Sequence, residues 1–236
     1  LSGVTARSAD LAASYMVAGF VHGVLNSDNI NISGESFDYG PWRFTPVFDP
    51  GFTAAYFDEA GLYAFARQAE AIHWDVVQLA IALARIADQG ALVDAINLFG
   101  DHYRQALVRR MLWRLGVLSK GEELDAALVQ SIEAALVASR ANIDRFFFDW
   151  QGGARRSASP EDPLYSSPEF SDFKERVADY QPARNLGHAY WAGEAPVSMD
   201  IETVEALWAP IAERDDWEPL HSCIAAIRAM GEAMRG

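Results

Sequence analysis

Three oxygen-bearing side chains near the start of the sequence have types and spacing that suit a magnesium site. Asp28 and Asn29 are adjacent, and Asp38 follows nine residues after Asn29. Mg²⁺ prefers hard oxygen ligands and is usually held by one or two protein carboxylates together with substrate phosphates. A carboxylate such as Asp28 can also accept a proton from a reacting hydroxyl. The pattern therefore indicates Mg²⁺-assisted transfer chemistry on a phosphate compound.

The segment that carries these side chains is expected to be a polar loop that leads into a short β-hairpin. Residues 26–41 are rich in Asn, Ser, Asp and Gly, Ile30 and Ile32 alternate with polar residues, and Ser33-Gly34 is a turn signal. A hairpin with about three residues per strand would bring Asn29 and Asp38 together. The alternative is that Asp28, Asn29 and Asp38 are ordinary turn residues that bond to nearby backbone groups.

Apolar residues at helical spacing dominate the rest of the chain, so the predicted fold class is mainly α. An aromatic-rich irregular region at 42–65 and a linker-like loop at 151–168, with Gly, Ser and Pro, interrupt the helices. Most of the aromatic side chains are expected in the core. The expected helices are 5–23, from about 68 to 85, 91–115 with a stop at Gly116, from about 122 to 147, 201–214 and 218–234.

Composition narrows the classes of partner. The chain has 236 residues, of which 50% are hydrophobic, and this is enough for a core in one domain, 1–236. A net charge of −14 disfavours nucleic acid and anionic membranes as partners. The single cysteine, Cys223, can form neither an intrachain disulfide nor a zinc cage and fits a reducing compartment. No apolar stretch approaches the roughly 20 residues of a membrane span, so a cytoplasmic protein is expected.

The polar loop resembles the catalytic and metal loops of protein kinases, H-R-D-x-x-x-x-N and D-F-G. If His22 is placed on the motif histidine, Asn29 falls on the metal-binding Asn, and Asp38-Tyr39-Gly40 falls on the D-F-G element. Val24 then replaces the usual catalytic Asp, as in a pseudokinase. Asp28 is the carboxylate of this loop that could take over that role.

Longer stretches resemble the selenoprotein O family, also known as the SelO or YdiU family. The resemblance is strong over about residues 5–90 and continues more weakly to about 180. It is carried by G-F-V-H-G-V-L-N-S-D-N at 19–29, F-D-Y-G-P at 37–41, F-D-P-G-F at 48–52, G-L-Y-A-F at 61–65, R-Q at 67–68 and H-W-D at 73–75.

The resemblance implies a kinase-like fold that binds ATP in a flipped orientation. It implies transfer of AMP to Ser, Thr or Tyr hydroxyls of protein substrates, with release of pyrophosphate. On this basis Asp28 is expected to be the catalytic proton acceptor, while Asn29 and Asp38 are expected to bind the nucleotide through Mg²⁺ or Mn²⁺. The expected setting is the cytoplasm of a bacterium.

Family members also have an N-terminal lobe with a nucleotide-clasping loop and a Lys/Glu pair, and nothing in this sequence matches it. The chain is therefore expected to be a kinase-like C-lobe, helical with a short β-hairpin that carries the catalytic and metal loops. Such a fragment is expected to be inactive alone and to form oligomers through the exposed surface that faces the N-lobe. The alternative is a non-catalytic helical interaction module derived from a pseudokinase. A small-molecule phosphotransferase is less well supported, because Val24 removes its base.

Overall fold

The computed structural model describes residues 1–235 and divides them into two compact units. The first comprises Leu1–Thr45 and Asp49–Arg110, and the second comprises Pro46–Phe48 and the chain from Met111 onward. The predicted mainly helical class is confirmed, since β1 (Phe20–Val21) and β2 (Arg43–Phe44) are the only strands of the described chain. Among residues 1–235, no helix has both the length and the apolar character needed to cross a bilayer.

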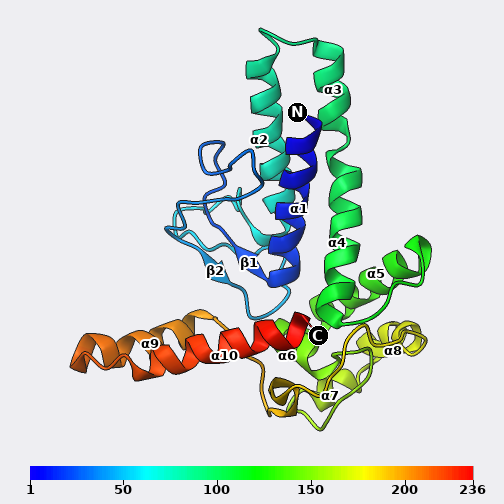
Figure 1. The fold of residues 1–236 in the computed structure, drawn as a ribbon, viewed down its shortest axis with the longest axis vertical. Helices are drawn as coiled ribbons and strands as arrows, with labels where there is room; N and C mark the ends of the chain where they lie inside the picture. The colour runs from blue at the N-terminus through cyan, green and yellow to red at the C-terminus, as the bar shows by residue number, and fades with distance from the viewer. Residues whose placement is uncertain (236) are drawn as a thin grey trace. The chain divides into compact units, whose positions relative to one another are not determined.

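The core of the first unit forms where α1 (Ser2–Ala18) packs against α2 (Gln68–Leu83), and Figure 1 shows these helices side by side. Ala9 and Ala12 of α1 are fully buried, and such small side chains let two helices approach closely. They share an apolar cluster with Leu25, Ile72 and Phe99. This cluster holds α1 and α2 together, and Leu25 of the polar loop packs against both helices there.

The first helix ends earlier than the sequence predicts. Gly19 adopts a left-handed conformation with φ 70°, and its N–H bonds back to the carbonyls of Tyr15 and Met16. This is a common way for a helix to end at glycine. His22, which was expected inside the helix, therefore follows β1, in the loop that leaves the strand.

The expected hairpin is reduced to a single antiparallel bridge between Ile30 and Ser36. The regular pairing lies outside it, where β1 and β2 run antiparallel with Phe20 opposite Phe44 and Val21 opposite Arg43. The hairpin prediction was thus wrong in extent, and the polar loop is instead closed at its base by β1 and β2.

Two helices expected to be continuous are each broken in two. The segment predicted as 91–115 forms α3 (Gln89–Asn97) and α4 (Phe99–Leu115), and the predicted stop at Gly116 is confirmed by its φ of 74°. The segment predicted as 122–147 forms α5 (Glu122–Ser139) and α6 (Ile143–Asp149).

The break between α5 and α6 has a local cause. Arg140 is left-handed with φ 55°, and the side chain of Asn142 accepts a hydrogen bond from the Arg145 N–H to start α6. Asn is a favourable residue for starting a helix in this way.

The aromatic-rich region at 42–65 only partly follows the expected burial. Phe48 and Phe65 are buried as predicted, whereas Tyr56 is 94% exposed and Phe57 is 56% exposed.

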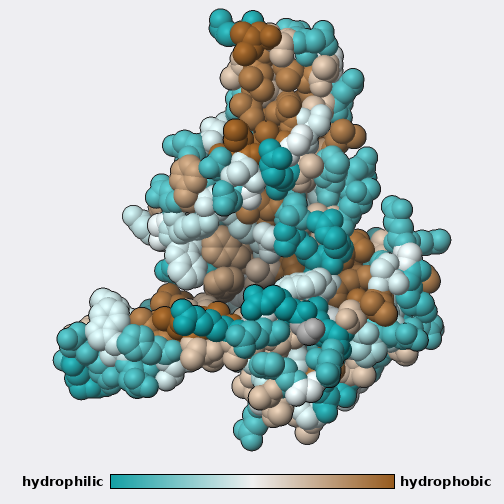
Figure 2. Space-filling view, viewed as in Figure 1, coloured by the Kyte–Doolittle hydropathy of each residue, from teal (hydrophilic) through white to brown (hydrophobic). Residues whose placement is uncertain are grey.

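The arginines Arg109 and Arg110 of α4 both bond to Asp10 of α1. Figure 2 shows apolar side chains gathered over the end of α2 and the start of α3, where Ile81 and Ile86 are exposed.

The second unit has an aromatic core around Phe146, Phe170 and Phe173. These side chains come from α6, the 3₁₀ turn η2 (Pro168–Phe170) and α8 (Ser171–Val177). The helices α9 (Ile201–Arg214) and α10 (Glu218–Arg235) confirm the two late predictions. Cys223 is half-buried, with its sulfur 3.7 Å from that of Met199.

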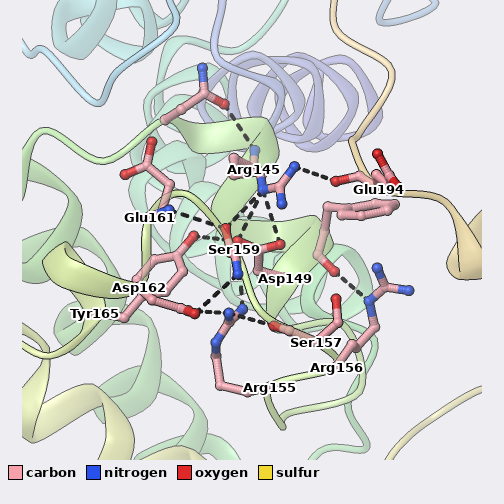
Figure 3. Close-up of polar contacts among 12 residues, drawn as sticks. Arg145, Asp149, Arg155, Arg156, Ser157, Ser159, Glu161, Asp162, Tyr165 and Glu194 are labelled. Carbon is pink, nitrogen blue, oxygen red and sulfur yellow. Dashed lines mark hydrogen bonds and ion pairs between the residues drawn. The ribbon is translucent and has the colours of Figure 1, made fainter.

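The predicted loop at 151–168 is held by a buried ionic network and contains the short helix α7 (Asp162–Tyr165). Asp149, 2% exposed, accepts a bond from the Arg145 Nε at 3.1 Å and from the Tyr165 hydroxyl at 3.0 Å, and Arg155 lies 3.5 Å away (Figure 3). The network ties α6 to both ends of the loop, so the segment is an ordered part of the second unit.

We expect Asp149→Ala to lower the free energy of unfolding by about 3 kcal/mol, because it leaves Arg145 and Arg155 without their shared buried carboxylate. Urea unfolding followed by circular dichroism would measure this. The matched control is Asp172→Ala, which removes an exposed i,i+4 pair with Arg176 and should cost about 0.5 kcal/mol or less. Equal losses for the two variants would contradict the structural role given to Asp149.

Candidate functional site

The polar loop between β1 and β2 places all three predicted site residues in one segment of the first unit. Its base is closed by the β1–β2 pairing and by a hydrogen bond from the Thr45 N–H to the carbonyl of Gly19, 2.8 Å long. Because both ends of the loop are fixed, its interior geometry depends on the side chains that bond across it.

His22 is the main brace of this loop. The side chain is fully buried, and its Nε2 lies 2.9 Å from the carbonyl oxygen of Phe37. Its Nδ1 accepts the Val24 N–H at 3.3 Å, so Nε2 carries the proton and donates to Phe37. Burial lowers the pKa of His22, and the Phe37 bond and the charge of Asp38 oppose that shift. A neutral, buried imidazole is suited to holding the loop rather than to acid-base chemistry.

Asn29 is buried and oriented by the backbone of the same loop. Its Nδ2 donates to the carbonyl of Val24 at 2.9 Å, and among the described residues no donor bonds to its Oδ1. The Phe37 N–H donates to the Asn29 carbonyl at 3.2 Å. This bond places Asn29 beside the residue that precedes Asp38, which is the juxtaposition expected from the sequence, reached here through a bridge rather than a full hairpin.

Asp38 is exposed and has a left-handed backbone, with φ 62°. Its carbonyl accepts the Gly40 N–H at 2.9 Å, which makes a tight turn directly after it. A left-handed conformation costs a non-glycine residue on the order of 1 kcal/mol, although Asp tolerates it better than most. Strain of this kind is common at functional positions.

Asp28 is exposed beside Asn29, and its charge acts on two side chains from other segments. Burial raises the pKa of Asp75 of α2 and of Tyr63, and the charge of Asp28 adds to both shifts. The Tyr63 hydroxyl in turn donates to Asn26 Oδ1. Asp28 therefore lies at the solvent-facing side of the loop, backed by Tyr63 and Asp75.

The donor set is compatible with magnesium. Within residues 1–235, no three His, Cys, Asp or Glu side chains lie together as a metal-binding group. Two oxygen donors, the free Oδ1 of Asn29 and the carboxylate of Asp38, suit an ion whose other ligands are phosphates and water. A structural zinc site would need four nitrogen or sulfur ligands, which this loop does not offer.

Comparison with known proteins places this loop in a defined family. The family profile described as "Protein adenylyltransferase SelO" matches residues 1–228. The chain belongs to the SelO family. The resemblance inferred from the sequence motifs is thereby confirmed.

Curated relatives carry the name "Protein nucleotidyltransferase YdiU". The protein of Gloeobacter violaceus is 34% identical over 235 residues, which cover 94% of this chain and 48% of the relative. That of Trichodesmium erythraeum is 32% identical over 249 residues, covering 94% of this chain and 49% of the relative. The chain thus spans about half the length of the curated relatives it matches, and these relatives are bacterial.

Two residues beside the loop of this SelO-family chain were quoted from the sequence only as parts of family motifs, with no role assigned to them. Gln68, at the start of α2, is fully buried; its Oε1 accepts the His22 N–H at 3.0 Å and its Nε2 donates to the Phe20 carbonyl at 2.8 Å. Asp75 is 5% exposed, and neither carboxylate oxygen has a partner in the described chain. Its position between Ile72 and Val76, on the apolar side of the helix, was a detectable signal.

We expect Gln68→Ala to lower the free energy of unfolding by about 2–4 kcal/mol, because it removes the side-chain partner of the buried His22 N–H and of the Phe20 carbonyl. Chemical denaturation would measure the loss. Gln105→Ala, which truncates an exposed glutamine on α4, is the control and should change stability by less than about 0.5 kcal/mol. A Gln68 variant as stable as this control would show that the bonds to His22 and Phe20 do not hold the loop.

Asp75 should make the folded chain less stable as pH rises. Burial, together with the charge of Asp28, raises its pKa from 3.8 to about 7. A folded-state pKa above the unfolded value means that the folded chain binds the extra proton, so stability is lost between about pH 4 and pH 7. We therefore expect the difference in unfolding free energy between Asp75→Asn and wild type to be on the order of 2 kcal/mol more favourable to the variant at pH 8 than at pH 4. Unfolding curves of both proteins at the two pH values test this, and parallel pH profiles would refute it.

Proposed function

We propose that this chain carries the proton acceptor and metal ligands of a protein adenylyltransferase, which moves AMP from ATP to Ser, Thr or Tyr hydroxyls of other proteins. The observation that carries the proposal is the arrangement of Asn29. Its amide is turned by the Val24 carbonyl so that Oδ1 is free, while its own carbonyl is bonded to the residue before Asp38. Membership of a family whose relatives are named nucleotidyltransferases supports the reaction class.

In this proposal Asn29 and Asp38 hold Mg²⁺ or Mn²⁺ on the phosphates of ATP. The bound ion supplies positive charge that offsets the phosphate charge. To hold the ion, Asn29 must be fixed and the Asp38 carboxylate must lie close to it. The bond from Asn29 to the Val24 carbonyl fixes Asn29, and the bonds of Phe37 to Asn29 and His22 position the residue before Asp38.

Asp28 is the proposed proton acceptor. The acceptor hydroxyl oxygen forms a bond to the α-phosphorus, the bond from that phosphorus to the bridging oxygen of the β-phosphate breaks, and pyrophosphate leaves. The hydroxyl proton goes to the Asp28 carboxylate, which is exposed and so accessible to a protein substrate. Most of the remaining rate enhancement in such transfers comes from positioning and charge neutralisation.

Val24 supports nucleotidyl transfer over a kinase-type phosphoryl transfer. It occupies the position of the kinase catalytic Asp, and only its backbone takes part, through its N–H to His22 and its carbonyl to Asn29. An aliphatic side chain there cannot accept a proton. The proposed fold is accordingly a kinase-like C-lobe with its base displaced to Asp28, acting in the bacterial cytoplasm together with a nucleotide-clasping lobe.

The test uses the natural gene product that contains this sequence, incubated with a protein acceptor, Mg²⁺ and ATP labelled at either the α- or the γ-phosphate. We expect α-label but no γ-label on protein. Asp28→Asn and Asp38→Asn should each lower the transfer about a hundredfold or more. Glu35→Gln, which removes an exposed charge from the same loop, is the control and should keep transfer near wild type.

Label transferred from the γ-phosphate would replace the proposal with a phosphotransferase. No transfer of either label, in a protein shown to be folded, would favour the non-catalytic interaction module. Full activity of the Asp28 and Asp38 variants would refute the assigned roles.

A further inference from the structure

A cavity of about 290 Å³ lies inside the first unit, between the start of α1, the polar loop and α2, three segments that Figure 1 shows together. Polar side chains that reach it include Ser8 of α1 and Asp75 of α2. Ser27 and Asn31 of the loop also line it and are exposed, so they form a rim open to solvent.

Two of these polar side chains are buried and unsatisfied. Ser8 is 1% exposed and Asp75 is 5% exposed, yet Ser8 Oγ and both Asp75 oxygens have no hydrogen-bond partner among the described residues. A buried carboxylate without a partner is costly in free energy. Both groups line the same cavity, so one ligand could satisfy them together.

The charged residues around the cavity indicate which sign of charge the ligand carries. No Lys, Arg or His side chain lines it. The nearest arginine in sequence, Arg7, directs its guanidinium to the Ile32 carbonyl, at 3.1 and 3.0 Å. The negative charge of Asp28 is close enough to act on both Asp75 and Tyr63. The carboxylate of Asp75, with the charge of Asp28 near it and no basic side chain in the lining, favours a cation over an anion.

The walls distinguish between kinds of cation. Hard metal ions take six or more oxygen ligands or ordered waters, whereas much of this cavity is aliphatic, with Val4, Ile30 and Leu79 among the lining residues. An alkylammonium ion carries three N–H donors on a hydrocarbon stem. The donors match the two oxygens of Asp75 and the Ser8 hydroxyl, and the stem matches the walls. The volume is several times the roughly 30 Å³ that one water occupies, which leaves room for a short stem.

We propose that this cavity binds a small primary alkylammonium ion, with its nitrogen on Asp75 and Ser8 and its stem against the aliphatic wall. The bound ion would place a positive charge beside the loop residues that line the cavity, Ser27 and Ile30 to Ile32. Its binding requires no nucleotide and does not depend on the proposed function.

The test is calorimetric titration of the chain with n-butylammonium chloride at pH 8, where Asp75 is largely ionised given its pKa of about 7. We expect one site, with amide NMR shifts clustered at residues 4–8, 27–32 and 75–79. Asp75→Asn should weaken binding about tenfold or more, and Ser8→Ala should weaken it a few-fold. Glu70→Gln, an exposed charge removed from the same helix, should bind like wild type.

Three results would overturn the proposal: unchanged binding by Asp75→Asn, equal binding of tetramethylammonium, which has no N–H donor, or the same NMR shifts with Mg²⁺ but none with butylammonium. Loss of folding is controlled by circular dichroism, and Asp75→Asn is expected to be stable at this pH. A second arm uses N-acetyl-lysine methylamide. If this lysine derivative binds more weakly than butylammonium, the natural ligand is a free small amine. If it binds more tightly, the same site takes the ammonium group of a lysine side chain.

Discussion

The geometry of the polar loop depends on one buried side chain, the carboxamide of Gln68. It bonds the N–H of His22 and the carbonyl of Phe20, so the start of the loop is fixed to the first turn of α2. His22 then bonds Phe37, and Val24 bonds Asn29. Each bond orients the next residue, and the chain of bonds ends beside Asp38. Because α2 is itself packed against α1, the candidate site is built outward from the helical core of its unit.

The predictions made from the sequence succeeded where a local pattern decides the structure. Gly116 stops a helix as expected, and α9 and α10 begin where apolar periodicity begins. The family was identified because its motif residues lie close together in the sequence. The proximity of Asn29 and Asp38 was also expected, and the Phe37–Asn29 bond provides it, although the roles of Asp28, Asn29 and Asp38 remain predictions.

The predictions failed where contacts distant in sequence outweigh local pattern. The Ile30–Ile32 alternation suggested a hairpin, but the regular strand pairing forms between Phe20–Val21 and Arg43–Phe44. No short sequence motif indicates that pairing. The break at Arg140 required a left-handed residue that its type does not indicate. Gln68 and Asp75 were quoted only as parts of family motifs and were given no structural role, because an amide or a carboxylate on a helix usually faces solvent. Only tertiary packing shows that these two face inward.

The left-handed backbone of Asp38 has a consequence for how this position can change over evolutionary time. Glycine would relieve the backbone strain at φ 62° but would remove the carboxylate, whereas most other residues would keep the strain and also lose the oxygens. Asparagine alone shares both the conformational tolerance and an oxygen donor. Under the metal-binding role proposed for Asp38, selection for folding and selection for chemistry act in opposite directions at this single residue, and a lineage without that role would be free to drift toward glycine there.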